Sequence, residues 1–411
     1  MERHVIIGNG IAGISAAETI RSIQPRSSIC VIAEEPFPPY SRPMISLVLE
    51  GRIGLDRLPI RAPDFYRRLE INSIIGEKVI SIEADRQRII TDQGQIIEYD
   101  RLLIATGANP RPIKAKGTDL GNVSFFRTEA HVQNILQALP TVKNAIVLGG
   151  GLVGFKAAYG LMRRGIRVTM LIRSGYPLSM QIDELAGQLI MRELRANGLE
   201  IKTGLEATEF IGNNVIKEAH LSDGSVTECQ LVMIGKGVMP AIEFVPRDKI
   251  EIDLGIVVDD HLQTSIPGVF AAGDVAQAMD IVRKQTWVNA IWPVAAEQGI
   301  VAGANMAGRS ISYRGSLGRN VIRIFGLDMM SAGIVNPPQN QGYKSLSRLD
   351  PFHNIYRKIT LLNDTLVGMI MVGNIEQGGV IISIIHRQLP LTVEPELLLE
   401  PGFNFSTLLA G

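Results

Sequence analysis

Two glycine-spaced segments of this chain have the residue types and the spacing that bind the pyrophosphate of a dinucleotide. The first is Gly8-Asn9-Gly10-Ile11-Ala12-Gly13, between the apolar run of residues 4–7 and an apolar helical pattern. Gly8 and Gly10 permit a tight turn and a close approach of the backbone to phosphate, and Gly13 lets the helix pack on the strand. The free N–H groups of the helix start would face the anion. Taken alone, such a segment is equally compatible with a glycine-rich turn that binds nothing.

An acidic residue stands where a ribose-binding carboxylate is expected after this loop. The apolar run Ile29–Ala33 predicts the next strand, and Glu34 follows it, 21 residues beyond Gly13. A carboxylate at this position accepts hydrogen bonds from the ribose hydroxyls. Strand, loop, helix, strand and acid together predict one βαβ dinucleotide unit.

The same pattern occurs a second time, 141 residues further along the chain. A strand at Ala145–Leu148 leads into the loop Gly149-Gly150-Gly151-Leu152-Val153-Gly154, and the next strand is expected at Val168–Ile172. Each copy closes with an apolar strand that ends in small residues, Leu102 to Gly107 in the first and Leu231 to Gly237 in the second. An internal repeat of this kind predicts two dinucleotide-binding domains of α/β type.

The first copy is longer because a proline-rich loop, Glu35 to Pro43, follows its acid. Prolines exclude a helix or a central strand there, and the loop holds an aromatic ring, a hydroxyl and Arg42 together. We therefore expect this insertion to be functional. Short β-rich runs from Val79 to Tyr99, joined by a turn at 92–95, predict antiparallel strands. Arg111, which stands between two prolines, marks a domain crossing.

A second acid, Asp274, follows the predicted strand of residues 264–273. Its carboxylate could bind a ligand hydroxyl, although an aspartate at a strand end commonly caps a helix instead. A helix is expected from Glu297 to Met306, and its N-terminal dipole could face an anionic or electron-rich group. Beyond residue 309 the composition changes to short strands with turns at 363–364 and 378–379, which predicts a third, α+β domain.

Composition excludes several classes of function. The chain carries 41 Lys and Arg against 41 Asp and Glu, so no net field favours nucleic acid or an anionic membrane, and we expect neither partner. No apolar run approaches a membrane span, and the first strand begins at His4 with no room for a signal peptide, so a cytoplasmic location is expected. The two cysteines, Cys30 and Cys229, form neither a redox pair nor a metal cluster, so no metal site is expected and both should be buried.

Taken together, these segments resemble the FAD-dependent pyridine nucleotide-disulfide reductase superfamily, in the branch without a redox disulfide that includes rubredoxin reductases, ferredoxin reductases and nitrite reductase flavoproteins. The motifs that carry the resemblance, in the family's order, are Gly8 to Gly13, Pro39-Tyr40-Ser41-Arg42-Pro43, Ala105-Thr106-Gly107, Gly149 to Gly154 and Thr264 to Asp274. The family's fold has two Rossmann-like domains, for FAD and NAD(P), the second inserted in the first, and a C-terminal α+β interface domain. The implied boundaries are 1–109 and 238–313 for FAD, 110–237 for NAD(P) and 314–411 for the interface domain.

The resemblance also implies which residues hold the cofactors. FAD would lie on the first glycine loop, with Glu34 on the adenosine ribose and Asp274 on the ribitol or pyrophosphate, and NADH or NADPH on the second loop. The helix starting near Glu297 would direct its N-terminus at the flavin pyrimidine. The implied cofactor-binding residues are Gly8, Gly10, Ile11, Ala12, Gly13, Glu34, Arg42, Pro43, Val79, Ala105, Thr106, Gly107, Gly149, Gly151, Leu152, Val153, Gly154, Arg173, Gly237, Gly273, Asp274, Glu297 and Gln298.

In function, the resemblance implies an NAD(P)H oxidoreductase. Disulfide reductases pass electrons to a cysteine pair, and thiol-based NADH oxidases use one cysteine near the loop of residues 41–46; this chain has neither. Electrons are therefore expected to pass between the nicotinamide and an external one-electron carrier, a ferredoxin- or rubredoxin-type iron–sulfur protein. The chain would act as a homodimer or as a subunit of a redox complex. An NAD(P)H oxidase that reduces oxygen directly and a non-catalytic flavoprotein scaffold or sensor are the alternatives.

Two departures from the family's pattern bear on mechanism. The second copy ends its second strand in Ile172-Arg173 where NADH-binding relatives have an acid, which predicts NADP(H) with Arg173 on the 2′-phosphate; an arginine on a solvated rim is the alternative. Lys156 stands where many relatives have a glutamate beside the flavin, and Leu47 where they have its lysine partner. We expect Lys156 to be a catalytic cation without its anion, acting on the flavin, unless its side chain extends to solvent.

The end of the chain is apolar, with Leu397 to Leu399, Phe403 and Phe405 close together. Such a surface is large to leave exposed. Because relatives dimerise or meet their acceptors through this domain, we expect the tail to be buried in a subunit or partner contact. Packing against its own domain is the alternative.

Overall fold

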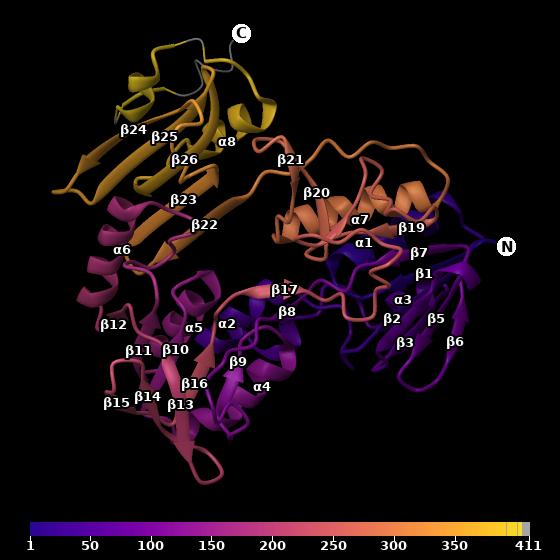
Figure 1. The fold of residues 1–411 in the computed structure, drawn as a ribbon, viewed down its shortest axis with the longest axis horizontal. Coiled ribbons are helices and arrows are strands. Elements are labelled where there is room, and N and C mark those ends of the chain that lie inside the picture. Colours follow the sequence, from indigo (N-terminus) through magenta and orange to yellow (C-terminus); the bar gives the residue numbers. More distant parts are fainter. Residues whose placement is uncertain (392, 401, 405–411) are drawn as a thin grey trace. The chain divides into compact units, whose positions relative to one another are not determined.

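The computed structural model describes residues 1–391, 393–400 and 402–404, which fall into two compact units of mixed α/β type (Figure 1). Unit 1 is made of residues 1–43, 56–109 and 238–318. Unit 2 is made of residues 44–55, 110–237 and 319–411. Each unit contains one of the two glycine loops.

Unit 1 is built on a five-stranded parallel sheet in the order β19-β7-β1-β2-β3. The middle strands are apolar runs with buried side chains, as expected for a parallel sheet covered on both faces. The register pairs Ile7 with Ile32 and with Ile104, so three strands end at the same level. The strands are β1 (Arg3–Ile7), β2 (Ser28–Ala33), β3 (Ile71–Ile75), β7 (Arg101–Ile104) and β19 (Val269–Ala271).

Helices α1 (Ile11–Ile23) and α7 (Trp292–Met306) pack side by side on one face of this sheet (Figure 1). Small residues allow their backbones to approach closely. A Cβ on Gly299 would collide with the carbonyl oxygen of Ala12, and one on Gly303 would lie 2.6 Å from that of Ala16. The glycine loop and its helix are thereby fixed against a second, long helix.

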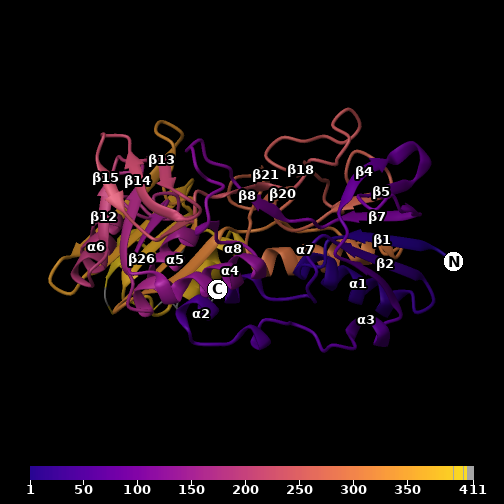
Figure 2. The same cartoon turned by 90° about the horizontal axis from the view of Figure 1, so that it is seen from below.

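The opposite face carries a three-stranded antiparallel sheet, β4 (Val79–Glu83), β5 (Arg88–Thr91) and β6 (Ile96–Glu98). Figure 2 shows β4 and β5 on one side of β1 and β2 and α1 on the other. This confirms the antiparallel strands predicted from Val79 to Tyr99.

The remaining elements of unit 1 are α3 (Phe65–Arg68), η3 (Ala84–Arg86), β8 (Ala108–Pro110), β17 (Val238–Pro240), β18 (Ile256–Val257), β20 (Ala276–Asp280) and β21 (Gln285–Trp287). The short turns η1 (Arg42–Met44) and η2 (Leu55–Arg57) stand at the junctions with unit 2.

Unit 2 repeats the parallel design with the order β12-β11-β10-β16-β9, which confirms the internal repeat. A small antiparallel sheet, β13-β14-β15, is inserted before β16. Its strands and helices are β9 (Val123–Phe125), α4 (Glu129–Ala138), η4 (Leu139–Thr141), β10 (Asn144–Leu148), α5 (Leu152–Arg163), β11 (Arg167–Ile172), α6 (Glu184–Ala196), β12 (Glu200–Thr203), β13 (Ala207–Gly212), β14 (Ile216–Leu221), β15 (Val226–Glu228) and β16 (Leu231–Ile234).

Helix α2 (Ile45–Glu50) belongs to unit 2, although sequence reasoning placed it in the first domain. Arg164, just after α5, donates to the carbonyls of Leu49 at 2.8 Å and Val48 at 3.0 Å. Gly160 of α5 leaves room for α2, since a Cβ there would lie 2.8 Å from Cγ of Leu49. These contacts, which join residues more than 100 positions apart, explain the assignment.

The C-terminal part of unit 2 is a five-stranded antiparallel sheet in the order β22-β23-β26-β25-β24, with α8 beside β23 and β26 (Figure 1). The predicted turn at Asn363-Asp364 is confirmed, but the one at Gly378-Gly379 is wrong, because these glycines begin α8. Gly378 suits that position, since a Cβ there would lie 2.5 Å from Sδ of Met330. The elements are β22 (Arg319–Ile324), β23 (Leu327–Gly333), β24 (Tyr343–Asp350), β25 (Ile355–Leu362), β26 (Thr365–Gly373), α8 (Gly378–Arg387) and η5 (Pro395–Leu399).

Asp183 ties this sheet to the dinucleotide fold of the same unit. Its Oδ1 caps α6 by accepting from the backbone N–H of Ala186 at 3.2 Å. Its Oδ2 accepts from the hydroxyl of Tyr356 at 2.6 Å and pairs with Nζ of Lys358 at 3.0 Å. Both partners lie on β25, so one carboxylate fixes a helix end and a neighbouring strand.

None of the described helices is long and apolar enough to cross a membrane.

The apolar tail packs on its own sheet, so the predicted burial in a partner contact is wrong for its central leucines. Leu398 and Leu399 are 1% and 7% exposed within the chain itself, and η5 lies against β24 and β25. Nη1 of Arg357 donates to the carbonyl of Glu400 at 2.7 Å and holds the end of the segment. Leu397 is 43% exposed. Phe405 lies outside the described residues.

Leu398→Ala should destabilise unit 2 by about 2–4 kcal/mol, because it removes a fully buried side chain and leaves a cavity. Leu397→Ala is the matched control; its side chain is largely solvated, so we expect a change below about 1 kcal/mol. Urea unfolding of both variants measures the difference. Equal stability of the two would mean that the segment does not pack on β24 and β25.

Candidate functional site

The candidate residues of unit 1 gather at the carboxyl edge of its parallel sheet. Gly8 follows β1, Glu34 follows β2, Ala105 follows β7 and Gly273 closely follows β19. Parallel strands end at one edge, and open α/β sheets bind ligands in the crevice outside that edge. The fold therefore brings together segments that are more than 260 residues apart in sequence.

Within the first loop, the three glycines have different roles. A Cβ on Gly8, whose φ is +111°, would collide with the carbonyl of Ala105, and a Cβ on Gly13 would collide with the carbonyl of Gly8. These two glycines serve the close packing of loop, strand and helix. A Cβ on Gly10 would meet no described atom within 4 Å. Gly10 is also the N-cap residue of α1 and offers no side chain to the first N–H groups, so open space lies before a helix N-terminus, as a pyrophosphate requires.

Asp274 lies beside this loop. A Cβ on Gly273 would be 3.2 Å from the Cβ of Ala12 in the first turn of α1. The backbone N–H of Gly273 donates to Oε1 of Gln298 at 2.8 Å, which fixes the turn that carries Asp274. Asp274 also acts electrostatically on Arg42.

Arg42 is held by its own loop. Its guanidinium donates to Oε1 of Glu35 and to the hydroxyl of Tyr40, and that hydroxyl donates to Oε2 of Glu35 at 2.7 Å. Burial lowers the pKa of Arg42, but the phenol of Tyr40 and the carboxylate of Glu35, helped by Asp274, outweigh it and raise the pKa. The proline-rich insertion thus keeps a permanent positive charge within electrostatic range of Asp274, a neighbour that sequence reasoning missed.

The other predicted FAD residues of the first domain occupy this edge in different ways. The side chain of Glu34 is 63% exposed and lies 3.3 Å from Nζ of Lys78, so its carboxylate remains accessible. Val79 is buried at the start of β4. The hydroxyl of Thr106 donates to the carbonyl of Ala241 at 2.8 Å, and Gly107 adopts φ +70°. Pro43 is exposed.

The helix start predicted near Glu297 is wrong, because α7 begins five residues earlier, at Trp292. Pro293 in the first turn suits a helix N-terminus, since its missing N–H would have no partner there. Glu297 is therefore an exposed residue in the second turn, and Gln298 is buried with its amide bound to Gly273. Any dipole effect of this helix acts at Trp292, and the carboxamide of Gln298 positions the turn before Asp274.

The second glycine loop reproduces the first, position by position. A Cβ on Gly149 would lie 2.5 Å from the carbonyl oxygen of Gly235, and one on Gly154 would collide with the carbonyl of Gly149. Gly151 caps α5 without a side chain, and no atom of the described chain lies within 4 Å of its Cβ position. Leu152 and Val153 form the half-buried first turn, and Gly237, at φ +89°, follows β16 at the same edge. Arg173 follows β11 and is exposed.

Lys156 has an acidic neighbour, which corrects the expectation of a cation without its anion. Burial lowers the pKa of Lys156 below its ordinary value, although the negative charge of Glu50 on α2 acts in the opposite direction. Glu50 lies one helical turn beyond Leu47 and therefore on the same face of α2. Its side chain is only 8% exposed, with Nη1 of Arg52 at 3.7 Å. Lys156 therefore has an acid of α2 within electrostatic range, although this acid is not at Leu47, the position that corresponds to the lysine of the family's pattern.

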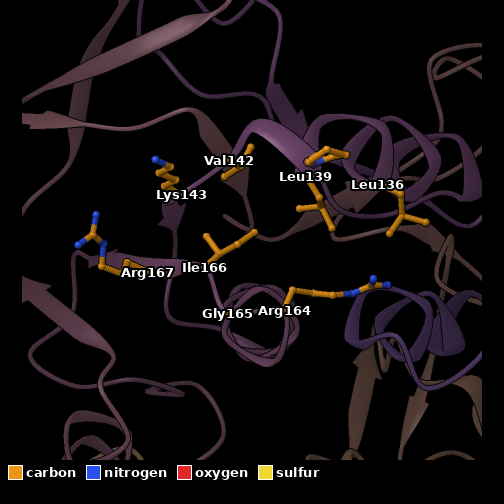
Figure 3. A pocket seen from close by; sticks show the side chains of 9 residues that line it. Leu136, Leu139, Val142, Lys143, Arg164, Gly165, Ile166 and Arg167 are labelled. Carbon is orange, nitrogen blue, oxygen red and sulfur yellow. The ribbon is translucent and has the colours of Figure 1, made fainter.

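A pocket of about 590 Å³ opens elsewhere in unit 2 (Figure 3). Apolar side chains such as Leu139 and Ile166 line it, and Lys143 and Arg167 stand together at one side. Because β10 begins at Asn144 and β11 at Arg167, the pocket lies at the amino ends of these strands. The glycine loop lies at their carboxyl ends, so the pocket is separate from the dinucleotide edge.

Among the described residues, Asp259, Asp260 and His261 have ligand atoms close enough together for a metal ion. The three belong to one surface loop, and Nδ1 of His261 lies 2.7 Å from Oδ1 of Asp260. The hydroxyl of Ser312 donates to Oδ2 of Asp260 at 3.0 Å. These bonds order the loop, and we assign no metal to it.

Two family models match the chain. The model described as pyridine nucleotide-disulphide oxidoreductase matches residues 2–299. The model described as rubredoxin NAD+ reductase C-terminal domain matches residues 319–389. The matches together cover both dinucleotide folds and most of the C-terminal sheet.

Named relatives are similar over nearly the whole chain. The assimilatory nitrate reductase electron transfer subunit of Bacillus subtilis is 30% identical over 402 residues, which are 97% of this chain and 51% of the relative. The epsilon subunit of the NADH-dependent phenylglyoxylate dehydrogenase of Aromatoleum evansii is 30% identical over 393 residues, 95% of this chain and 93% of the relative. The crystal structure of the covalent putidaredoxin reductase-putidaredoxin complex has a TM-score of 0.90 at 25% identity and covers 100% of this chain and 98% of that chain. The chain spans about half the length of the first curated relatives it matches.

Proposed function

Because the chain belongs to the pyridine nucleotide-disulphide oxidoreductase family, which is FAD-dependent and uses NAD(P)H, we propose that it is an NAD(P)H oxidoreductase that exchanges electrons with an external iron–sulfur carrier. When bound, FAD accepts electrons in pairs from a reduced nicotinamide and releases them one at a time. The carrier would be a ferredoxin- or rubredoxin-type protein.

The residues of unit 1 fit FAD. The open position at Gly10 and the uncapped helix start would take the pyrophosphate, and Glu34 would accept the adenosine ribose hydroxyls. Asp274 would accept hydrogen bonds from the ribityl chain or orient the pyrophosphate through its neighbours. Arg42, held positive by Glu35 and Tyr40, would neutralise negative charge on the cofactor.

The two cysteines are the observation that supports an electron acceptor outside this chain. Cys30 and Cys229 are both buried, and burial raises their pKa to about 11 and about 12. A thiol with such a pKa is not ionised at neutral pH and is neither a nucleophile nor a redox relay. Since the chain has no further cysteine, electrons have no thiol path within it. The two buried free thiols also agree with a cytoplasmic location, which we include in the proposal.

The C-terminal sheet supports the class of partner. Residues 319–389 match the domain of rubredoxin NAD+ reductases, and the putidaredoxin reductase complex joins a similar chain to its redox partner. The nitrate reductase and phenylglyoxylate dehydrogenase relatives are both named as subunits. We therefore include in the proposal that the chain works as a subunit of a redox complex or as a homodimer.

Carrier reduction by the purified, FAD-loaded protein tests the proposal. With NADH or NADPH and a [2Fe–2S] ferredoxin or a rubredoxin, we expect carrier reduction to account for most of the nicotinamide oxidised. Hydrogen peroxide formation, followed in parallel, measures direct reaction with oxygen. Peroxide equal to the nicotinamide oxidised would identify an oxidase instead, and failure to turn over with any acceptor would identify a non-catalytic flavoprotein.

Asp274→Ala should cost the protein most of its FAD, because it removes a carboxylate at the carboxyl edge and leaves Arg42 without one of its neighbouring charges. A charge-assisted contact of this kind contributes about 1.5–3 kcal/mol, which is roughly 10- to 100-fold in affinity. Asp85→Ala, at an exposed acid of the same unit, is the control. The ratio of flavin to protein absorbance after dialysis measures retention, and full retention by the Asp274 variant would contradict its assignment.

A further inference from the structure

Three charged side chains from separate segments lie near the second glycine loop, and two of them are in contact. Lys236 follows β16, and its Nζ donates to Oε1 of Glu206, which lies between β12 and β13. The side chains are 22% and 45% exposed, so the pair is accessible without being fully solvated. Arg173, at the end of β11, acts electrostatically on the same carboxylate.

The backbone places this cluster at the dinucleotide edge. Cα of Lys236 lies 3.4 Å from the position that a Cβ on Gly149 would take, so it stands next to the first glycine of the loop. Glu206 follows β12, the neighbour of β11 in the sheet. In a dinucleotide fold, the end of the second strand is where the adenosine ribose binds. That strand is β11 here, and it ends in Ile172-Arg173 without an acid.

The carboxylate of Glu206 is fully ionised at neutral pH. The hydrogen bond from Lys236 is the main cause that lowers its pKa, with a smaller contribution from Arg173. A carboxylate accepts hydrogen bonds from ribose hydroxyls but repels a phosphate. Arg173 acts on the same carboxylate, so a 2′-phosphate at the end of β11 would meet the negative charge of Glu206 as well as the positive charge of Arg173.

We propose that Glu206 selects the coenzyme: it replaces the ribose-binding acid that the end of β11 lacks, and it favours NAD(H) over NADP(H). This reverses the preference predicted from Arg173 alone. Lys236 is a positioning residue that holds the carboxylate at the loop. The inference rests on the proposed function, because it requires a dinucleotide on the second glycine loop.

Binding of NAD+ and NADP+ to the oxidised, FAD-loaded protein tests the proposal without turnover. The two ligands differ only in the 2′-phosphate, and isothermal titration calorimetry gives each Kd. For the unmodified chain we expect NAD+ to bind at least tenfold more tightly than NADP+. Glu206→Gln should tighten NADP+ at least tenfold and weaken NAD+ severalfold. Flavin content and melting temperature check that the variant is intact.

Glu200→Gln is the matched control. Glu200 also has a lysine neighbour, Lys202, at 3.7 Å, but it stands at the opposite end of β12 from Glu206. We expect both affinities to be unchanged in this variant. Unaltered NADP+ binding by Glu206→Gln, with NAD+ still bound by the unmodified chain, would overturn the role of Glu206 alone. Failure of the unmodified chain to bind either ligand would overturn the proposed function and the selection together.

Discussion

Gly10→Val yields a folded protein that purifies with little or no FAD. A Cβ at Gly10 meets no described atom within 4 Å, so we expect strand, loop and helix to keep their packing. In the proposed function, the same space is where the pyrophosphate of FAD approaches the backbone. An overlap that costs several kcal/mol removes more than about 90% of the bound flavin, since each 1.4 kcal/mol is a tenfold change in affinity. Flavin absorbance relative to protein, together with the melting temperature, measures both effects.

Two glycines supply the controls for this result. Gly151→Val makes the same change at the equivalent position of the second loop, which is also open, and should keep FAD while losing NAD(P)H reactivity. Gly13→Ala adds only a methyl group, but that group collides with the carbonyl of Gly8 and should prevent stable folding. Stoichiometric FAD in Gly10→Val would mean that the pyrophosphate does not bind at this loop.

Local patterns explain why most of the fold could be predicted. In each copy, the strand, the glycine loop and the start of the helix follow one another within about ten residues, so a short segment of sequence is enough to predict the motif. The repeat of that segment then fixed the number of dinucleotide folds. Asp274 could be placed beside the first glycine loop only through the family resemblance, because an aspartate at the end of a strand commonly caps a helix.

Partners joined through space could not be predicted in the same way. Arg42 is held by Glu35 and Tyr40, which are near in sequence, but nothing in their spacing indicates that both turn toward the guanidinium. The neighbours of Lys156 and Arg173 come from segments more than 30 residues away. Side-chain pairs of this kind depend on how helices and strands pack against one another, and the hydrophobic periodicity of the sequence does not indicate this.

The two misplaced elements differ in whether a signal was available. Pro293 is a helix-start signal that could have located the N-terminus of α7, because proline is favoured in the first turn. The glycine pair at 378–379 normally indicates a turn, and here it begins α8 because Gly378 must leave room for the sulfur of Met330. The contact between Gly378 and Met330 can be seen only in the three-dimensional structure.

Lys156 and Glu50 should behave as one charge pair. Glu50 is almost fully removed from solvent, and its negative charge acts on the half-buried ammonium of Lys156. Lys156→Glu then places two carboxylates where one ammonium and one carboxylate stood. We expect a loss of about 2–4 kcal/mol in the free energy of unfolding, because a buried charge that loses its opposite charge is strongly destabilising.

The charge-swapped double variant decides whether that loss is electrostatic. Lys156→Glu combined with Glu50→Lys restores one charge of each sign at the contact between α2 and α5, so it should regain at least half of the lost stability in a double-mutant cycle. A double-mutant cycle that shows no coupling energy between Lys156 and Glu50 would mean that the side chain of Lys156 extends to solvent.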